Sequence, residues 1–284
     1  MMFNMRSTLM TNVAPALRRA LVVSFVTFST FFLSHQSAAQ SLNITSGGED
    51  GGPVEILADD GIEWQQDESI FIARGNARAT RGEVNVTADL LRAYYYDNAG
   101  TTEIWRMDAE GSVEIRSLTE SAFGDMAVYD VLKGVLVLTG GDVRFVAGAD
   151  TISAKKQLEY WEKKQMAVAR GDAVAVRGDK TLKADVLAAH FVRDGTGDTK
   201  VQRIDAYDNV LIVTTKDHIV ADRGVYDVPN GIANLTGNVR LTRGQNVLTG
   251  CRAKVNLNTN VSKLFSCNDG TGTRVQGILQ PENK

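Results

Sequence analysis

Apolar residues recur with a period of two after a series of regularly spaced turn-forming residues. The second and fourth residues after each of these anchors are apolar, and the residue between them is charged in four of the six cases. A period of two is typical of a β-strand with one buried face. The anchors follow one another at intervals of 29 to 37 residues and are Gly75, Gly111, Gly141, Gly171, Asp208 and Gly237. The pattern therefore predicts repeated units of about thirty residues.

Each unit continues with a polar turn, a second strand and another turn. The thirteenth residue after each anchor is always Ala or Gly. The second turn is clearest at Asn230–Gly231, because an Asn-Gly pair accepts the positive φ of a tight hairpin. Glycine within a strand usually marks a bulge or bend, and six bends at one level would fold the whole sheet over. We therefore predict an all-β fold, a folded-over antiparallel sheet of two-strand repeats.

One face of this sheet is predicted to be apolar and to point inward. Its residues are Val113, Ile115, Val143, Phe145, Ile152, Leu182, Val210, Ile212, Ile219, Val239, Leu241 and Leu248. The face is interpreted either as a packed core or as a groove that holds acyl chains. The Ala and Gly residues at the thirteenth position leave space in a groove, or they serve close packing at a sharp bend. The period of the pattern does not decide between these interpretations.

The first residues have the features of an export signal. Arg18 and Arg19 precede an apolar run from Ala20 to Leu33, and the small residues Ser37-Ala38-Ala39 follow. A short apolar run that ends in small residues is typical of a cleaved secretory signal. We expect a signal peptide at 1–39, a flexible leader at 40–53, the repeat domain at 54–269 and a tail at 270–284.

Charge and cysteine content narrow the class of protein. Without the predicted signal, 28 basic and 34 acidic residues give a formal charge of −6, which provides no basic surface for nucleic acid. Cys251 and Cys267 both lie in the predicted exported part, where a pair of cysteines favours a disulfide. They are symmetric about the predicted turn at Thr259, so antiparallel pairing is expected to place them directly opposite one another.

No pattern of residues indicates catalysis. The predicted mature chain has two histidines, His190 and His218, and neither accompanies a nucleophile motif such as G-x-S-x-G. Acidic residues recur at one position of the repeat, which is typical of an outward structural residue: Asp89, Asp125, Asp185 and Asp222. The chain has no phosphate-binding loop of the G-K-[ST] type. We expect no enzyme activity, no cofactor and no metal site.

Three short sequence motifs resemble those of a known family. The segment Val54-Glu-Ile-Leu-Ala-Asp-Asp-Gly-Ile-Glu-Trp64 leads to Gly-Asn-Ala at Gly75 and to Ala-Asp at Ala88. The last two motifs recur later in the chain, as Gly237-Asn-Val and as Ala221-Asp followed by Tyr226. Over residues 54 to 265 the chain resembles the OstA-like/LptA family. The resemblance implies a folded-over β-jelly-roll, open along one side, in the periplasm.

The resemblance also implies a function. Such proteins bind the acyl chains of lipopolysaccharide inside the fold and associate head to tail through their edge strands. They thereby bridge inner-membrane and outer-membrane transport proteins, and a partner ATPase supplies the energy. The chain is long for the family, which leaves open a related architecture or a fused protein with two roles. The alternatives are an exported structural β-solenoid that binds only protein partners, and an exported polysaccharide-active enzyme.

Overall fold

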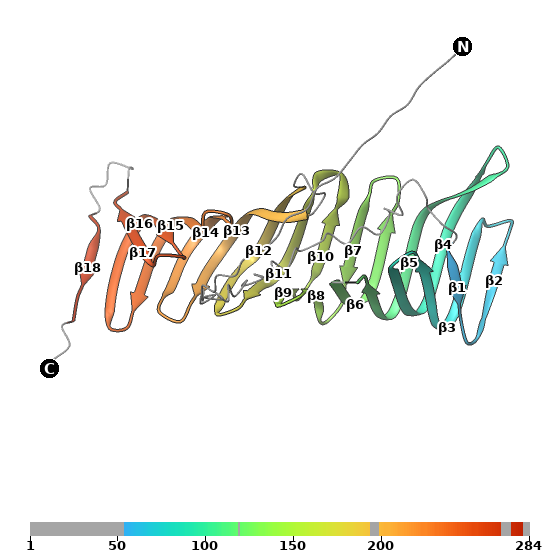
Figure 1. Cartoon of the computed structure of the whole chain (residues 1–284), viewed down its shortest axis with the longest axis horizontal. Coiled ribbons are helices and arrows are strands. Elements are labelled where there is room, and N and C mark those ends of the chain that lie inside the picture. The colour runs from blue at the N-terminus through green and yellow to red at the C-terminus, as the bar shows by residue number, and fades with distance from the viewer. Residues whose placement is uncertain (1–53, 119, 194–198, 268–273, 281–284) are drawn as a thin grey trace, which may run out of the picture. The chain divides into compact units, whose positions relative to one another are not determined.

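The structure, a computed structural model, describes residues 54–118, 120–193, 199–267 and 274–280. These residues form one antiparallel sheet of 18 strands, in which neighbouring strands pair as the chain advances (Figure 1). A short 3-10 helix, η1 (Glu162–Lys164), connects β10 to β11. The strands are β1 (Glu55–Leu57), β2 (Gly61–Gln65), β3 (Ile70–Arg81), β4 (Val84–Asn98), β5 (Thr101–Arg116), β6 (Glu120–Asp130), β7 (Val135–Thr139), β8 (Val143–Ala147), β9 (Asp150–Ala154), β10 (Gln157–Trp161), β11 (Met166–Arg177), β12 (Lys180–Arg193), β13 (Thr199–Val213), β14 (His218–Asp227), β15 (Ile232–Arg243), β16 (Asn246–Asn256), β17 (Val261–Phe265) and β18 (Gln276–Ile278).

The sheet bends at the anchors, as the sequence predicts. The register of the β3–β4 pairing shifts between Arg74 and Ala77, and the register of the β15–β16 pairing shifts between Thr236 and Val239. At the first bend, two successive residues have positive φ angles, 76° at Gly75 and 41° at Asn76. Two left-handed residues in a row form a bulge that turns the strand. The prediction of an all-β folded-over sheet is confirmed.

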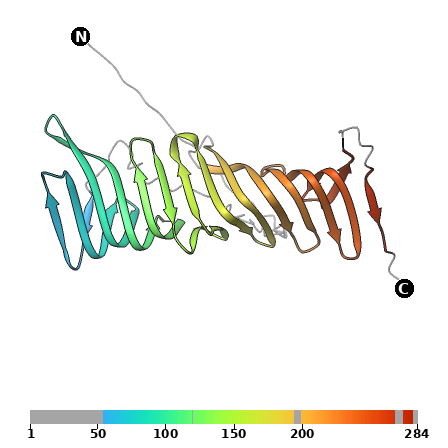
Figure 2. The ribbon, with the colours of Figure 1, turned by 180° about the vertical axis from the view of Figure 1, so that it is seen from behind.

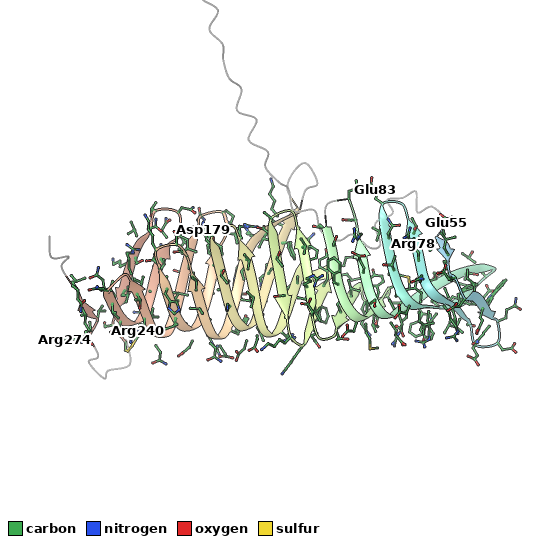
Figure 3. All side chains as sticks on the ribbon, turned by 90° about the horizontal axis from the view of Figure 1, so that it is seen from below. Glu55, Arg78, Glu83, Asp179, Arg240 and Arg274 are labelled. Atoms are coloured by element: carbon green, nitrogen blue, oxygen red, sulfur yellow. A yellow bond between two sulfur atoms is a disulfide. The ribbon has the colours of Figure 1, made fainter. Side chains whose placement is uncertain are left out.

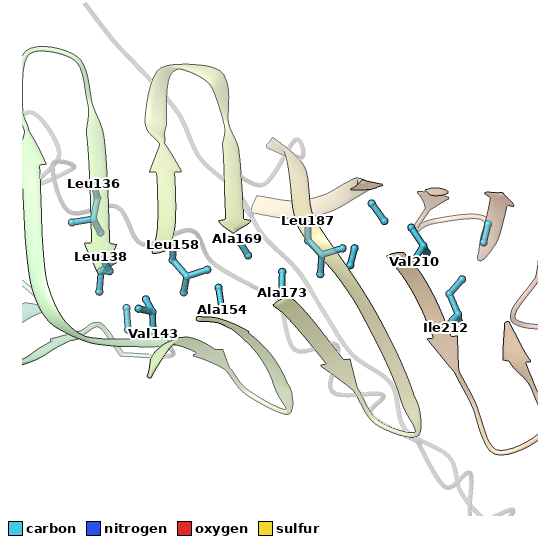
Figure 4. Close-up of a cluster of buried hydrophobic side chains, with 14 of the residues drawn as sticks. Leu136, Leu138, Val143, Ala154, Leu158, Ala169, Ala173, Leu187, Val210 and Ile212 are labelled. Atoms are coloured by element: carbon cyan, nitrogen blue, oxygen red, sulfur yellow. The ribbon is translucent and has the colours of Figure 1, made fainter. Parts of the chain in front are cut away.

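The bend divides the sheet into two layers that face each other. The first layer comprises β2, β7, β10, β17 and the parts of the long strands that pair with them. The second layer comprises β1, β8, β9, β18 and the corresponding parts on the other side of the bend. Figure 2 shows the long strands crossing from one layer to the other. The buried apolar cluster lies between the layers (Figure 4).

Small residues allow the two layers to meet closely at the bend. Ala88 and Ala184, each 4% exposed, pair with the fully buried Ala77 and Ala173. These residues occupy the thirteenth and second positions after their anchors, so they lie directly beside the bulge. Of the two interpretations of the thirteenth position, the structure therefore favours close packing at a sharp bend.

The recurring acidic residues also belong to the bend. The carboxylate of Asp222 accepts a hydrogen bond from Asn238 Nδ2 at 2.9 Å on the next strand. A Cβ atom added to Gly111 would lie 2.1 Å from Asp89 Oδ2, and Gly111 has a φ of +78°. A side chain at this anchor is therefore excluded both by the aspartate and by the backbone conformation. The aspartates therefore fix the bend from the outside of the sheet. Figure 3 shows that charged side chains also lie on the outside away from the bend, such as Asp179 in the turn between β11 and β12.

Four long strands are interrupted at the bend instead of bulged. They are the pairs β1 and β2, β7 and β8, β9 and β10, and β17 and β18. The break before β2 and the break before β10 have the same hydrogen bonds: Asp59 N donates to Gly75 O at 2.8 Å, and Lys155 N donates to Gly171 O at 2.7 Å. The two sites are 96 residues apart (171 minus 75). The arrangement of β1 and β2 at the start of the sheet therefore recurs at β9 and β10, in the middle of the chain.

The two cysteines form the predicted disulfide, with Cα atoms 5.0 Å apart. The register differs by one residue from the prediction, because β16 and β17 pair Arg252 with Phe265. The residue opposite Cys251 is therefore Ser266, and Cys267 lies one position beyond it. The turn has four residues, 257–260, so its centre lies between two residues and not on Thr259.

The expected segment boundaries fall partly outside the described residues. The predicted signal peptide and leader, residues 1–53, belong to the part that the structure does not describe. The expected tail from residue 270 contains the short strand β18, which pairs with the second-layer part of β16 through Gln276 and Thr249.

Candidate functional site

The structure brings the twelve predicted inner-face residues together on the inside of the second layer. Eight of them are at most 5% exposed, and Phe145, Ile152, Leu182 and Leu248 are partly buried against the same apolar cluster. Whether they contact a lipid remains a prediction. Their common orientation follows from the period of two, which the bulges preserve from one unit to the next.

A cavity of about 190 Å³ opens between the layers in the middle of the sheet, lined by residues from β6 to β14 and by Leu257 after β16. Four of the predicted residues line it: Phe145, Ile152, Leu182 and Ile212. The other eight do not. An apolar cavity of roughly 150 Å³ is already large enough to bind benzene. This cavity therefore has room for part of an apolar chain, and the remaining inner face around it is packed.

The opposite wall of the cavity comes from the first layer, whose residues are not among the twelve predicted from the sequence. Figure 4 shows Leu136, Leu158 and Leu187 pointing from these strands toward the second layer. Tyr160 and Tyr226 also line the cavity. In the segment Val135–Thr139 apolar residues are consecutive, so the sequence pattern does not show which of them face inward.

Charged residues line the cavity where the second-layer strands end. Arg177 Nε donates to Asp150 Oδ2 at 2.8 Å, and this hydrogen bond raises the pKa of the guanidinium. The Arg177 side chain is 55% exposed although it lines the cavity. The cavity is therefore open to solvent along this rim, which we define as the ends of the second-layer strands that carry Glu120, Asp150, Arg177 and Lys180.

Glu120 is the exception among these charged residues. It is 4% exposed, and its Oε2 atom has no hydrogen-bond partner. Burial raises the pKa of its carboxyl group to about 8. Glu120 lies between Ala147 on β8 and Ser117, whose backbone N donates to the backbone oxygen of Glu120 at 2.9 Å, and neither residue hydrogen-bonds the Oε2 atom. At neutral pH this carboxyl group is mainly protonated.

The two histidines have no catalytic arrangement. His190 Nε2 lies 2.9 Å from Asp205 Oδ2, and Arg203 Nε donates to Oδ1 of the same aspartate at 2.6 Å. His218 is exposed at the start of β14. Within the described residues, His, Cys, Asp and Glu side chains form no group of three that could hold a metal ion.

A family model matches the chain twice. The family is described as "LptA/(LptD N-terminal domain) LPS transport protein", and the matches cover residues 55–159 and 151–261. Together they span well over half of the chain. The chain belongs to this family. It is therefore a lipopolysaccharide transport protein, and the family is one of transport proteins and not of enzymes.

Other known proteins are similar to this lipopolysaccharide transport protein. An uncharacterized protein of Rhizobium meliloti (strain 1021) is 26% identical over 133 residues, which is 45% of this chain and 69% of the relative. Among solved structures, LptH of Pseudomonas aeruginosa is described as the LptA-homologous periplasmic component of the lipopolysaccharide transport device. It is 10% identical and covers 81% of this chain and 96% of its own, with a TM-score of 0.22. Among the described residues no helix is long and apolar enough to cross a membrane.

The two family matches explain the length of this transport protein. They overlap in residues 151–159, which belong to β9 and β10. These are the broken strands whose hydrogen bonds repeat those of β1 and β2. We call residues 55–159 the first copy and residues 151–261 the second copy. Between a related architecture and a fusion, the two matches favour a repeat of the family pattern within one continuous sheet.

In the second copy, the position equivalent to Glu120 is Asp217. Each of the two residues lies nine positions after its anchor, Gly111 or Asp208. Asp217 is 3% exposed and accepts hydrogen bonds from Arg243, at 2.6 Å from Nε and 2.9 Å from Nη2. Arg243 also donates to the backbone oxygen of Asn260 at 3.0 Å, which connects the second layer to the β16–β17 turn. The rim is thus bonded across the layers at this end.

Proposed function

We propose that this protein is a periplasmic carrier that binds acyl chains of lipopolysaccharide between its two layers. It bridges inner-membrane and outer-membrane transport proteins by pairing of edge strands. The cavity between the layers supports the first part, because an apolar space that opens at a polar rim suits a lipid with apolar chains and a polar headgroup. The alternative is a structural protein that binds only protein partners.

The internal junction of the two copies supports the second part of the proposal. Broken strands of the first copy pair there with broken strands of the second: β7 with β10 and β8 with β9. The ends of the sheet have the same kind of broken strand. Among the described residues, β2 pairs only with β3, and β18 only with β16. An unpaired strand edge binds another chain by adding its strand to the sheet.

The disulfide supports an extracytoplasmic location. Disulfides persist in oxidising compartments such as the bacterial periplasm and are rare in the cytosol. The Cys251–Cys267 bond joins β16 to the segment after β17. It therefore stabilises the end of the sheet at which a partner strand is proposed to bind.

Photo-cross-linking tests the carrier. A benzophenone amino acid replaces Phe145 or Ile212, both of which line the cavity. The purified protein is irradiated with lipopolysaccharide and analysed on a denaturing gel with an antibody to the lipid. We expect a lipid adduct from both positions, because acyl chains between the layers lie within reach of each probe.

The matched control has the probe at Lys183, which follows Leu182 on β12 and is exposed on the other face. It should give little adduct. Equal labelling from Lys183 and Phe145 would contradict binding between the layers. The absence of a lipid adduct from both interior positions would favour the structural alternative.

A further inference from the structure

Glu120 differs from every other buried acidic residue that the structure describes. Five acidic residues are at most 9% exposed, and four of them accept a hydrogen bond from an arginine at 2.6 or 2.7 Å. These pairs are Asp108 with Arg106, Glu159 with Arg170, Asp205 with Arg203, and Asp217 with Arg243. Glu120 has no such partner, and its Oε2 atom is buried without a hydrogen bond. A buried polar group without a partner is destabilising unless something else satisfies it.

The charged side chains around Glu120 are bonded to other groups. On β9 and β11, Asp150 and Arg177 bond to each other. On β10, Glu159 accepts a hydrogen bond from Arg170 Nε at 2.6 Å. On β12, Lys180 lies 3.6 Å from Asp179. None of these contacts includes Glu120, so its carboxyl group remains available to a molecule in the cavity.

We propose that Glu120 is a specificity residue of the cavity, where its carboxyl group hydrogen-bonds a hydroxyl group carried on a bound acyl chain. This inference rests on the proposed function. A hydroxyl group both donates and accepts, so it matches a carboxyl group that can do the same. An anionic group is disfavoured, because Arg177 and Lys180, which line the same cavity, are already paired with Asp150 and Asp179. A cationic group would lose its hydration among the leucines of the wall.

In the second copy, a protein side chain satisfies the equivalent acidic residue. Arg243 occupies the position opposite Asp217 and satisfies its carboxylate. The position opposite Glu120 is Ala147. The substitution Ala147→Arg therefore gives Glu120 the partner that Asp217 has, and it should occupy the hydroxyl site from within the protein.

Competition binding tests the inference. Wild type, Glu120→Leu, Glu120→Gln and Ala147→Arg are loaded with the apolar fluorophore N-phenyl-1-naphthylamine. Displacement is measured with methyl 3-hydroxymyristate and with methyl myristate, which differ only in the hydroxyl group and carry no charge. We expect wild type to bind the hydroxy ester about tenfold more tightly, which corresponds to about 1.4 kcal/mol. Glu120→Leu and Ala147→Arg should bind both esters equally, and Glu120→Gln should keep part of the preference.

Thermal denaturation of each variant controls for folding. Glu120→Leu removes an unpaired buried group, so its melting temperature should not fall. Equal binding of the two esters to wild type, or an unchanged preference in folded Glu120→Leu, would overturn the inference and leave the proposed function intact. If neither ester displaces the fluorophore from wild type and lipopolysaccharide gives no adduct at Phe145, both proposals fail.

Discussion

The two copies differ in the acidic residues that point inward at the ends of the second-layer strands. In the second copy each of these residues pairs with an arginine, whereas in the first copy one member of each pair is missing. Asp150, which lies near the end of the first copy and directly before the second, pairs with Arg177 of the second copy, and Asp217 pairs with Arg243. Directly before the first copy, Val54 stands in the place of Asp150, and the Nε atom of Arg81 is buried without a hydrogen bond. The first copy also has Ala147 in the place of Arg243, opposite Glu120. The backbone is therefore the same in both copies, but the acidic and arginine side chains at the strand ends are hydrogen-bonded in the second copy and unsatisfied in the first.

The difference shows which parts of the repeat serve the fold and which can vary. The bend is maintained in both copies by a bulge that begins with glycine and by an aspartate beside it, at Gly111 with Asp89 and at Gly237 with Asp222. The rim lies at the other end of the second-layer strands, where the pairing of backbones does not depend on side chains. Rim residues can therefore change from copy to copy without a change of register.

The largest expected effect is the pH dependence that Glu120 imposes on the first copy. The unfolded chain loses this proton near pH 4.5, whereas the folded protein keeps it up to about pH 8. Because the folded state binds more protons between these values, the free energy of unfolding should fall as pH rises from 4.5 to 8. The loss should be roughly 5 kcal/mol, since one pKa unit corresponds to about 1.4 kcal/mol.

Urea denaturation across this pH range, compared with Glu120→Gln, isolates the effect because glutamine does not titrate. A pH profile of the same slope in both proteins would show that the carboxyl group is already ionised at pH 7.

The next effect concerns the second copy. Arg243→Ala leaves the buried carboxylate of Asp217 without its cation, so the free energy of unfolding should fall by about 3 to 5 kcal/mol. Urea denaturation at pH 7 measures the change. Arg240→Ala, on the exposed face of the same strand, is the matched control and should cost less than about 0.5 kcal/mol. Similar losses in the two variants would mean that the Asp217 pair contributes no more than an exposed arginine.

Two leucine substitutions compare the packed and the open part of the interior. Leu241 is 3% exposed and does not line the cavity, so Leu241→Ala should cost about 2 to 5 kcal/mol. Leu182 borders open space, and Leu182→Ala should cost less because part of its surroundings is already empty. Leu182→Ala should instead lower the yield of lipid adduct from a probe at Phe145. Equal losses of stability and equal adduct yields would remove the distinction between the two regions.

The smallest change in stability is expected at the edge of the first copy. Ile62 on β2 is 51% exposed, so Ile62→Lys should change the free energy of unfolding by less than about 0.5 kcal/mol. A lysine on an edge strand opposes strand addition, so concentration-dependent self-association should weaken in sedimentation. Val225→Lys, within the sheet on β14, should leave association unchanged. Association that is insensitive to Ile62→Lys would contradict pairing through β2.

The fold was predictable because its main determinants recur in the sequence. Anchors such as Gly75 and Gly237 mark the bends, and the alternation at Val113 and Ile115 identifies the inner face of the second layer. The wall of the first layer was not predictable in the same way. Inward and outward positions cannot be distinguished in β7, because its first four residues, from Val135 to Leu138, are all apolar and the period of two disappears.

Glu120 was missed because the rim residues flank turns and resemble ordinary polar turn residues. The register reveals their relation: the ninth residue after an anchor faces the sixth residue after the next anchor. In this way Asp150 meets Arg177 and Asp217 meets Arg243. A search for acidic residues at the ninth position with arginines at the next sixth position would have found both pairs. It would also have shown that Glu120 faces Ala147.

The junction at β7 to β10 has a consequence for proposed assemblies of this chain. Because the two copies belong to one polypeptide, their strands meet without the entropy loss of bringing separate molecules together. A row of chains joined end to end would grow by two domains at each association step. Every second junction in such a row would be covalent, so dilution or competition could separate the row only between chains.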